Sequence, residues 1–300
     1  MIRRIIFLIP LFLFSCIAET PKDIDGFLIK WKLSKYSLEI KNLSRNAIIL
    51  KTIQKDDGEI PVGVSKIGGL PDLPEDVEIP KWNGKSLSFI CQLNMKEIAY
   101  LNGDSLLPNN GFLYFFYDQD QGTWGFDVKD KGSFKVIYYP GNKESLKRII
   151  KPNDLEMIFT SCIIKPSIMK NIPPSDSKYI DSLNLSREEN DRYFELEMDI
   201  NEEGTIHKLF GYPNQIQGDM QYECPLVTNG LYLGDATGYN DSKVSEYLKE
   251  YDNWMLLLQV DSDPNTEMMW GDVGRIYYWI KKDELLNKNF DGVWMILQCS

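Results

Sequence analysis

The sequence predicts a strand-rich α+β fold, a single compact domain built from two similar units, because three short patterns each occur twice. The first pattern is K-[IL]-x-G-x-P-[DN]. The second is three apolar residues followed by Gln, an aliphatic residue and then Asn or Asp. The third is G-x-[IL]-Y followed by two aromatic residues. The first copies span 66–72, 89–94 and 111–116, and the second copies span 208–214, 256–261 and 274–279. Three repeats in the same order indicate an internal duplication with pseudo-two-fold character.

The folded part begins with a predicted helix and strand over 24–50, before the first of two glycine- and proline-rich segments. We name these segments the first turn (SKIGGLPDLP, 65–74) and the second turn (HKLFGYPNQIQ, 207–217). Both have turn chemistry, since glycine tolerates positive φ, proline fixes φ, and Asp or Asn caps the next element of the chain. Pro71 removes one backbone donor, so the first turn is poorly equipped to cradle a phosphate.

The two glutamine-containing runs are apolar almost throughout, as is typical of strands buried on both faces. The aromatic runs that follow a glycine are rich in strand-forming residues. A short helical piece is expected over 94–101, and further strands near Trp124 and over 134–139 and 293–297. Gln92 and Gln259 occupy matching places, and a buried amide must find partners. They are expected either to pin the copies or their turns together or to line a cleft between the copies.

The units are expected at about 60–141 and 205–300, joined by a polar connector over 142–204 with a loop at its double proline, 173–174. A helix is predicted to start in this connector at Ser186, because Ser186-x-x-Glu189 has the form of a capping box. The connector is expected to be the least constrained part of the chain.

The N-terminus resembles a bacterial lipoprotein signal. Arg3 and Arg4 precede an apolar stretch, 5–14, which is shorter than the about 20 residues that span a bilayer but suits a signal peptide. The letters LFS then lead directly into Cys16, which is expected to be diacylated and to anchor the chain to the membrane. An ordinary cleaved signal with an incidental cysteine is the alternative interpretation.

These features predict a signal peptide over 1–15, an N-terminal segment over 16–44 and a soluble domain over 45–300. The expected location is the cell envelope, with the domain outside the cytoplasm and the membrane as a partner through Cys16.

The chain is acidic, with 33 Lys and Arg against 44 Asp and Glu, a net charge of −11 that falls to −13 without Arg3 and Arg4. Such a surface repels nucleic acid and suits a basic protein partner or cations, while general solubility is the alternative explanation. The G-x-G-x-x-G and G-x-x-x-x-G-K-[ST] motifs are absent, and no cofactor is expected.

Four cysteines remain besides Cys16, namely Cys91, Cys162, Cys224 and Cys299. An oxidising compartment permits disulfides, but Cys91 and Cys299 lie in apolar runs where a free cysteine packs as a small hydrophobic residue. These thiols are expected to be mostly free and buried. A structural zinc site is not expected, because the sequence has no CxxC pair.

The chain also resembles the YwqG-like family, a bacterial family of unknown biochemical function. The resemblance rests on successive signatures over roughly 45–299: SKIGGLPDLP, LSFICQLNMKEIA, LPNNGFLYFFYD, HKLFGYPNQIQGDM, WMLLLQVDSD, WGDVGRIYYWI and VWMILQC. It implies a mostly β, roll-like α+β single domain and carries no established activity. Members of the family are commonly cytosolic, so a lipoprotein-type signal departs from the family pattern.

Catalytic candidates are few. His207 is the only histidine, so a Ser-His-Asp or Cys-His arrangement would have to include it, and the G-x-S-x-G motif is absent. Asp219 and Asp272 are the acidic catalytic candidates. The alternative interpretation of His207 is a strand-end residue that hydrogen-bonds the backbone of its turn.

The segment QVDSDPNTEMMWGD has the alternating carboxylates of a calcium loop, which makes Asp261 and Asp263 the metal candidates. Thr266 stands where such a loop uses glycine, and Asp272 stands where it uses glutamate. Carboxylates at alternate positions are equally typical of a solvated strand end.

Candidates for binding are His207, Tyr212, Gln217, Trp270 and Asp272. Tyr212 and Trp270 lie on predicted turns, where exposed rings often mark recognition surfaces. The second turn differs from the first at three positions, with His207 for Ser65, Phe210 for Gly68 and Tyr212 for Leu70. A site is therefore expected at the second turn.

Together these observations favour a non-enzymatic, lipid-anchored binding protein, with immunity-like recognition of a basic protein as one version. A carboxylate- or metal-dependent envelope hydrolase that uses Asp261, Asp263 and Asp272 near His207 is the first alternative. A structural envelope lipoprotein is the second.

Overall fold

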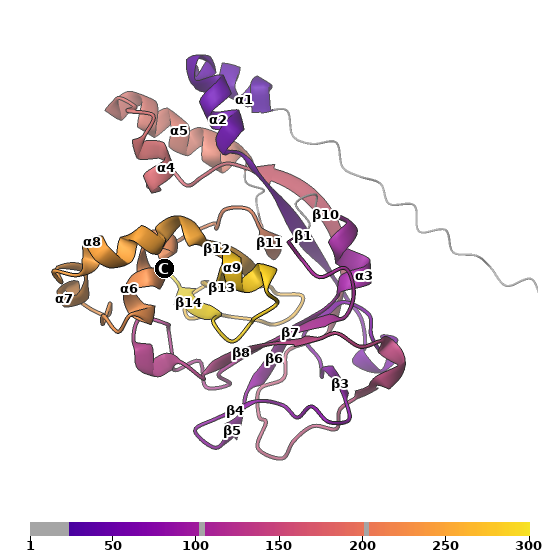
Figure 1. Cartoon of the computed structure of the whole chain (residues 1–300). Coiled ribbons are helices and arrows are strands. Elements are labelled where there is room, and N and C mark those ends of the chain that lie inside the picture. The colour runs from indigo at the N-terminus through magenta and orange to yellow at the C-terminus, as the bar shows by residue number, and fades with distance from the viewer. Residues whose placement is uncertain (1–23, 102–105, 201–203) are drawn as a thin grey trace, which may run out of the picture.

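The computed structural model describes residues 24–101, 106–200 and 204–300, and Cys16 with the predicted signal peptide lies outside these ranges. A ten-stranded sheet with the order β14-β13-β12-β11-β1-β10-β2-β6-β7-β8 forms its centre (Figure 1). Its strands are β1 (Arg45–Gln54), β2 (Lys66–Ile67), β6 (Ser88–Asn94), β7 (Phe112–Tyr117), β8 (Phe134–Tyr139), β10 (Cys162–Asn171), β11 (Lys208–Phe210), β12 (Trp254–Asp261), β13 (Arg275–Lys281) and β14 (Trp294–Gln298). Two small sheets pair β3 (Asp72–Pro74) with β9 (Leu146–Arg148) and β4 (Lys81–Trp82) with β5 (Lys85–Ser86). The predicted strand-rich, mixed α and β fold is confirmed.

Helices gather at two places. Helices α1 (Ile24–Lys30), α2 (Ser37–Leu43), α4 (Lys178–Asp181) and α5 (Arg187–Ile200) form a helical part at one end of the molecule, while α6 (Met220–Thr228), α7 (Ala236–Tyr239), α8 (Val244–Tyr247) and α9 (Lys282–Leu286) lie beside β12 to β14 (Figure 1). Helix α3 (Met95–Ile98) follows β6, and the 3-10 helices are η1 (Ser34–Tyr36), η2 (Asp57–Glu59), η3 (Ala99–Leu101), η4 (Val128–Asp130), η5 (Lys143–Ser145) and η6 (Leu248–Asn253). Among the described residues, no helix combines the length and apolar character that crossing a bilayer requires.

The strand order is symmetrical about the central pair β1 and β10, which are antiparallel over their whole length. Outward from β1 lie β11, β12, β13 and β14, and outward from β10 lie β2, β6, β7 and β8. Strand β1 therefore pairs with the first strand that follows β10 at its side of the sheet, β11, and β10 pairs with the first short strand that follows β1, β2. Two equivalent hydrogen bonds make this connection, from the Leu50 amide to the His207 carbonyl (2.8 Å) and from the Ile164 amide to the Ser65 carbonyl (3.3 Å).

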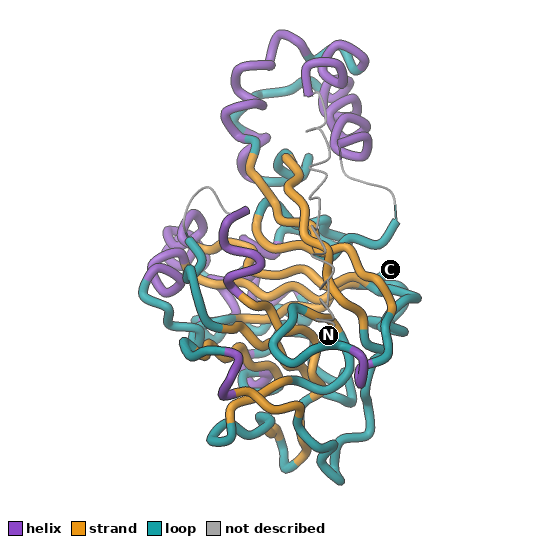
Figure 2. The backbone as a smooth tube through the Cα atoms, turned by 90° about the vertical axis from the view of Figure 1, so that its right-hand side faces the viewer, coloured by secondary structure: helices purple, strands orange, loops and turns teal. Residues whose placement is uncertain are grey.

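The sheet curls so that its two ends face each other, and Figure 2 shows its strands stacked below the helical part. Phe115 of β7 contacts Tyr278 of β13 with ring centroids 5.1 Å apart, and Phe134 of β8 contacts Trp294 of β14 at 5.3 Å. The main core fills this roll, because the apolar residues of both strand sets form one buried cluster. A separate cluster holds the helical part together around Tyr193 of α5.

The capping box predicted at Ser186 is confirmed. The Ser186 amide donates to Glu189 (2.9 Å), and the Glu189 amide donates to the Ser186 hydroxyl (3.3 Å), immediately before α5. The expected polar connector over 142–204 instead contains a central strand, β10. Its sequence CIIKPSIMKN did not suggest a buried strand because much of it remains partly exposed, with Pro166 opposite Leu50 in the register.

The other four cysteines, Cys91, Cys162, Cys224 and Cys299, are free and buried in the described structure, as expected. Burial raises the pKa of the Cys91 and Cys224 thiols well above the ordinary value. They therefore act as small apolar residues of the core.

Candidate functional site

The two turns are held by matching sets of hydrogen bonds. Gln92 donates to the Val64 carbonyl (2.8 Å) and accepts from the Asp72 amide (2.8 Å). The Tyr114 hydroxyl donates to the Asp72 carbonyl (2.7 Å). In the second half, Gln259 donates to the Ile206 carbonyl (2.9 Å) and accepts from the Asn214 amide (2.9 Å). The Tyr277 hydroxyl donates to the Asn214 carbonyl (2.6 Å). Each buried glutamine thus anchors the turn of its own half rather than joining the halves or lining a cleft.

A buried lysine lies under each turn, but only the first has a carboxylate partner. Lys66 is fully buried, and its ammonium group contacts Asp57 (2.6 Å) and the Leu70 carbonyl (2.5 Å). Burial lowers the pKa of Lys66, and the hydrogen bond to Asp57 opposes that shift. Asp57 also accepts from the Leu70 amide (3.0 Å), so it ties the lysine to the turn.

In the second half, side-chain amides take the places of the carboxylates of Asp57 and Asp72. Asn171 accepts from the Tyr212 amide (3.2 Å), which is the role of Asp57 in the first half, and Asn214 replaces Asp72. Lys208 is also fully buried and donates to the Asn214 side chain. Burial, assisted by the charge of Arg275, lowers the pKa of Lys208 to about 7.

His207 connects the second turn to β12. It is 2% exposed, its Nδ1 accepts from the Asp261 amide (3.1 Å), and its Nε2 lies 3.0 Å from Asp263. The hydrogen-bond pattern assigns the ring proton to Nε2, because Nδ1 faces a backbone donor. Burial raises the pKa of Asp263, but the bonds from His207, the Asn265 amide and Thr52 outweigh it and hold that pKa below its usual value. Both ring nitrogens are thus engaged by protein groups.

The two metal candidates point to different partners. Asp261 accepts from the Ile206 amide (2.9 Å) and lies 2.9 Å from the Arg275 guanidinium, whereas Asp263 faces His207. Within the described ranges, no group of three or more His, Cys, Asp or Glu residues is arranged to hold a metal ion.

Asp219 caps α6. Its carboxylate accepts from the Gln221 amide (2.9 Å) and from the Tyr251 hydroxyl (2.7 Å), and burial raises its pKa. One turn further along α6, burial raises the pKa of Glu223 to about 7, and the Tyr239 hydroxyl donates to that side chain (2.7 Å).

The remaining binding candidates are dispersed. Trp270 is fully buried, lies edge-on to Tyr117 and Phe159, and donates its indole N–H to the Asp261 carbonyl (3.2 Å). Asp272 and Gln217 are exposed. Tyr212 is buried with its hydroxyl bonded to the Leu43 carbonyl (2.7 Å), and its ring lies against Arg45.

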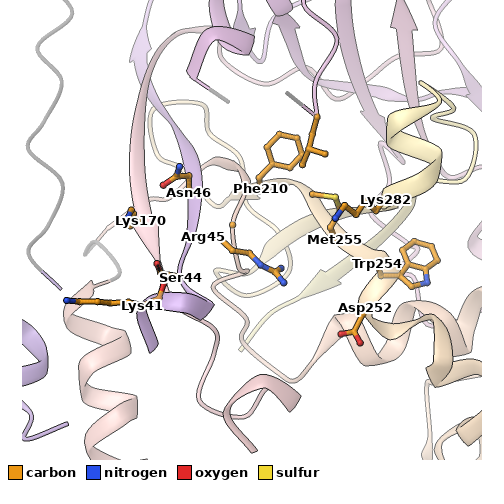
Figure 3. Close-up of a pocket in the computed structure, with 12 residues that line it drawn as sticks. Lys41, Ser44, Arg45, Asn46, Lys170, Phe210, Asp252, Trp254, Met255 and Lys282 are labelled. Carbon is orange, nitrogen blue, oxygen red and sulfur yellow. Dashed lines mark hydrogen bonds between the residues drawn. The ribbon is translucent and has the colours of Figure 1, made fainter. Parts of the chain in front are cut away.

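A pocket of about 420 Å³ opens between the helical part and the second turn (Figure 3). Phe210 and Gly211 of the second turn line it with Trp254 and Met255 of β12. Its charged lining residues are Lys41, Arg45, Lys170, Asp252 and Lys282, and its remaining lining residues are Ser44, Asn46 and Leu106. The pocket is therefore predominantly cationic, in a chain whose net charge is −11.

Arg45 is the best-supported cation of this pocket. Its guanidinium group lies 4.2 Å from the centre of the Tyr212 ring and 5.1 Å from that of Tyr179, and it donates to the Tyr179 hydroxyl (3.2 Å). None of the ion pairs formed by the described residues includes Arg45. Aromatic rings therefore position this charge, and the Tyr179 hydroxyl that accepts from Arg45 in turn donates to Asp252 (3.4 Å).

Phe210 occupies a backbone conformation that favours glycine. Its φ is 59°, and Gly68 at the matching position of the first turn has φ 71°. A non-glycine residue in this region is destabilised by about 1 kcal/mol or more. The Phe210 ring lines the pocket.

Sequence patterns identified only one side of this pocket. The differences of Phe210 from Gly68 and of Tyr212 from Leu70 were visible because the turns repeat. No sequence pattern identified Arg45, Lys170 or Lys282 as pocket residues, because they come from three separate segments that only the sheet order brings together.

Comparison with known proteins gives a family but no activity. A comparison with curated proteins found no match. A family model described as "Domain of unknown function (DUF1963)" matches residues 65–299, which includes both turns and most of the sheet. The chain therefore belongs to the DUF1963 family, whose function is unknown.

Proposed function

We propose that this chain is a non-enzymatic binding protein that receives an anionic group in the pocket beside the second turn. The observation that carries the proposal is Arg45, a cation stacked on Tyr212 without a carboxylate partner among the described residues, in the wall of a pocket of about 420 Å³. A pocket of this size suits a small ligand or one end of a larger one.

Binding is favoured over catalysis because the acid–base candidates other than the exposed Asp272 are engaged by protein groups. Both His207 nitrogens have partners, Asp219 caps a helix, and Asp261 is paired with Arg275. A general base must reach a substrate proton, and none of these groups is free to do so. No observation favours the hydrolase alternative.

The proposal includes the location inferred from the sequence. We propose that residues 1–15 are a signal peptide, that Cys16 is lipid-modified, and that the domain over 45–300 faces outside the cytoplasm as an envelope lipoprotein. An acidic exterior suits a basic protein partner, which the pocket would contact through an acidic group of that partner. The YwqG-like branch of the family and an origin by duplication, with units at about 60–141 and 205–300, are part of the same proposal. The matching bonds of Gln92 and Gln259 support the duplication.

Thermal unfolding of the purified full chain in different sodium salts tests anion binding. At equal ionic strength, sulfate, phosphate or glutamate is expected to raise the midpoint above that in chloride, because a ligand of the folded state stabilises it. Arg45→Gln is expected to abolish the increase. Lys51→Gln is the matched control, since Lys51 is an exposed lysine of the same strand outside the pocket. Because sulfate and phosphate also stabilise folded proteins generally by exclusion from their surface, the proposal fails if the increase is as large in Arg45→Gln as in the wild-type protein.

A further inference from the structure

We infer that the ligand of this pocket is a free acidic α-amino acid, a molecule with two carboxylates and one ammonium group. The inference rests on the proposed function and specifies the ligand class. Arg45, Asp252 and Lys282 line the pocket and bring two positive charges and one negative charge to it. Glutamate and aspartate carry the complementary set of charges.

The other two charged lining residues contribute less to such a ligand. Lys41 is already paired with Asp25 (2.5 Å). Lys170 is opposite Asn46 in the register of β1 and β10, and Asn46 directly follows Arg45. Because successive side chains of a strand point to opposite faces, Lys170 lies on the other face of the strand pair from Arg45. The charges that face the Arg45 side of the pocket are therefore those of Asp252 and Lys282.

Arg45 and Asp252 are held near each other without a direct ion pair. The Tyr179 hydroxyl accepts from Arg45 (3.2 Å) and donates to Asp252 (3.4 Å), so a single hydroxyl separates the two charges. The ion pair that Asp252 makes with Lys178 is long (3.6 Å) and exposed, and pairs of this kind contribute little. Arg45 and Asp252 are therefore both available to a ligand.

An α-amino acid presents its opposite charges in the same way. Its carboxylate and its ammonium group are attached to one carbon, so one molecule can contact Arg45 and Asp252 at once. A carboxylate is also the planar partner that a guanidinium group binds through two parallel hydrogen bonds. A ligand that carries only anionic groups is less favourable here, because the Asp252 carboxylate repels it.

Lys282 is the reason to expect an acidic side chain on this amino acid. Lys282 begins α9, is exposed, and has no ion-pair partner in the part of the chain that the structure describes. Met255 and Lys282 line the same side of the pocket, and the Arg45 side chain extends toward that side (Figure 3). Lysine binds an anionic group as a point charge. A second carboxylate, on methylene groups that lie against Met255, matches this placement.

Isothermal titration of the purified full chain tests each charge of the ligand in turn. The first probes are L-glutamate and L-aspartate. Glutarate lacks the ammonium group, 4-aminobutyrate lacks the α-carboxylate, and L-glutamine lacks the side-chain charge. Glutamate or aspartate is expected to bind about tenfold or more tightly than each of these three, the ratio that one charge-assisted contact supplies.

Asp252→Asn tests the contact with the ammonium group. It is expected to weaken glutamate binding about tenfold and to strengthen glutarate binding, because it removes a negative charge from the pocket. General damage to the fold would weaken both. Asp181→Asn is the matched control and is expected to change neither, since Asp181 is an exposed aspartate of α4 outside the pocket. Lys282→Gln is expected to reduce the affinity for glutamate to that for glutamine.

The inference is overturned if glutarate, 4-aminobutyrate or glutamine binds the wild-type protein as tightly as the acidic amino acids, or if neither acidic amino acid binds. An unchanged ratio of glutamate to glutarate affinity in Asp252→Asn also overturns it. In all these cases the proposed function stands as long as the effect of sulfate on thermal unfolding depends on Arg45. If that effect is as large in Arg45→Gln as in the wild-type protein, the proposed function fails and this inference fails with it.

Discussion

Replacing Lys208 with methionine is expected to stabilise the protein at neutral pH, although the variant loses a hydrogen bond. The ordinary lysine pKa is 10.5, and burial lowers that of Lys208 to about 7 in the folded protein. At about 1.4 kcal/mol for each pH unit of difference, keeping this buried lysine protonated is unfavourable by about 5 kcal/mol. Methionine has a similar length and removes the charge. The Asn214 side-chain oxygen accepts from Lys208 and also from Gln259 Nε2 (3.3 Å). In the variant this oxygen therefore still has Gln259 as a hydrogen-bond donor.

The pH dependence of this effect has a definite sign. Between pH 7 and 10.5 the unfolded chain binds a proton at Lys208 and the folded chain does not, so wild-type stability rises with pH in that window. The difference between Lys208→Met and wild type is therefore largest at or below pH 7 and shrinks by roughly 2 kcal/mol by about pH 9. Comparing the two proteins at each pH cancels the contributions of all other titrating groups.

Urea unfolding followed by tryptophan fluorescence measures both quantities. Lys66→Met at the matching position of the first turn is the control, because Lys66 has Asp57 as its partner. Because Asp57 opposes the shift of the Lys66 pKa, Lys66→Met is expected to gain less stability at neutral pH than Lys208→Met, or none. The reasoning is refuted if Lys208→Met unfolds with the same pH dependence as wild type, or if both variants are destabilised equally.

Three other predictions concern separate parts of the chain. Glu223→Gln is expected to be more stable than wild type by about 3 kcal/mol at pH 8 but not at pH 4, because burial raises the Glu223 pKa from 4.5 to about 7 and wild-type stability therefore falls as pH rises through that window. Equal urea midpoints of the two proteins at pH 8 would contradict this prediction. Ser186→Ala is expected to lose about 1 kcal/mol in urea unfolding, since it removes the N-terminal cap of α5, and an unchanged midpoint would contradict this role. Cys16→Ala is expected to abolish incorporation of a labelled fatty acid, and labelling equal to wild type would eliminate the proposed anchor.

The repeated turns were predictable because their chemistry is local. Glycine, proline and a capping Asp or Asn occur at fixed offsets, so the matching positions of Gln92 and Gln259 were evident before the structure. What the glutamines bond was not evident, since their partners lie 20 to 53 residues away in the chain. The central strand β10 was missed because Lys165, Pro166 and Ser167 interrupt any apolar run.

The candidate site was predictable only where the two halves could be compared. Phe210 and Tyr212 stand out against Gly68 and Leu70. The expectation that Trp270 is an exposed ring did not hold, because the curled sheet places Tyr117 and Phe159 against it. Arg45 precedes the pocket residues of β12 by more than 200 positions, and only the pairing of β1 with β11 brings them together.

The pocket beside the second turn is tested most directly by titrating sulfate and inorganic phosphate into the full chain and into its Arg45→Gln variant. The account predicts saturable binding to the wild-type protein, at least about tenfold weaker binding to Arg45→Gln, and unchanged binding to Lys51→Gln. Equal affinity of the wild type and Arg45→Gln, or binding of neither anion to the wild type, would contradict the assignment of Arg45 as the cation that receives the ligand.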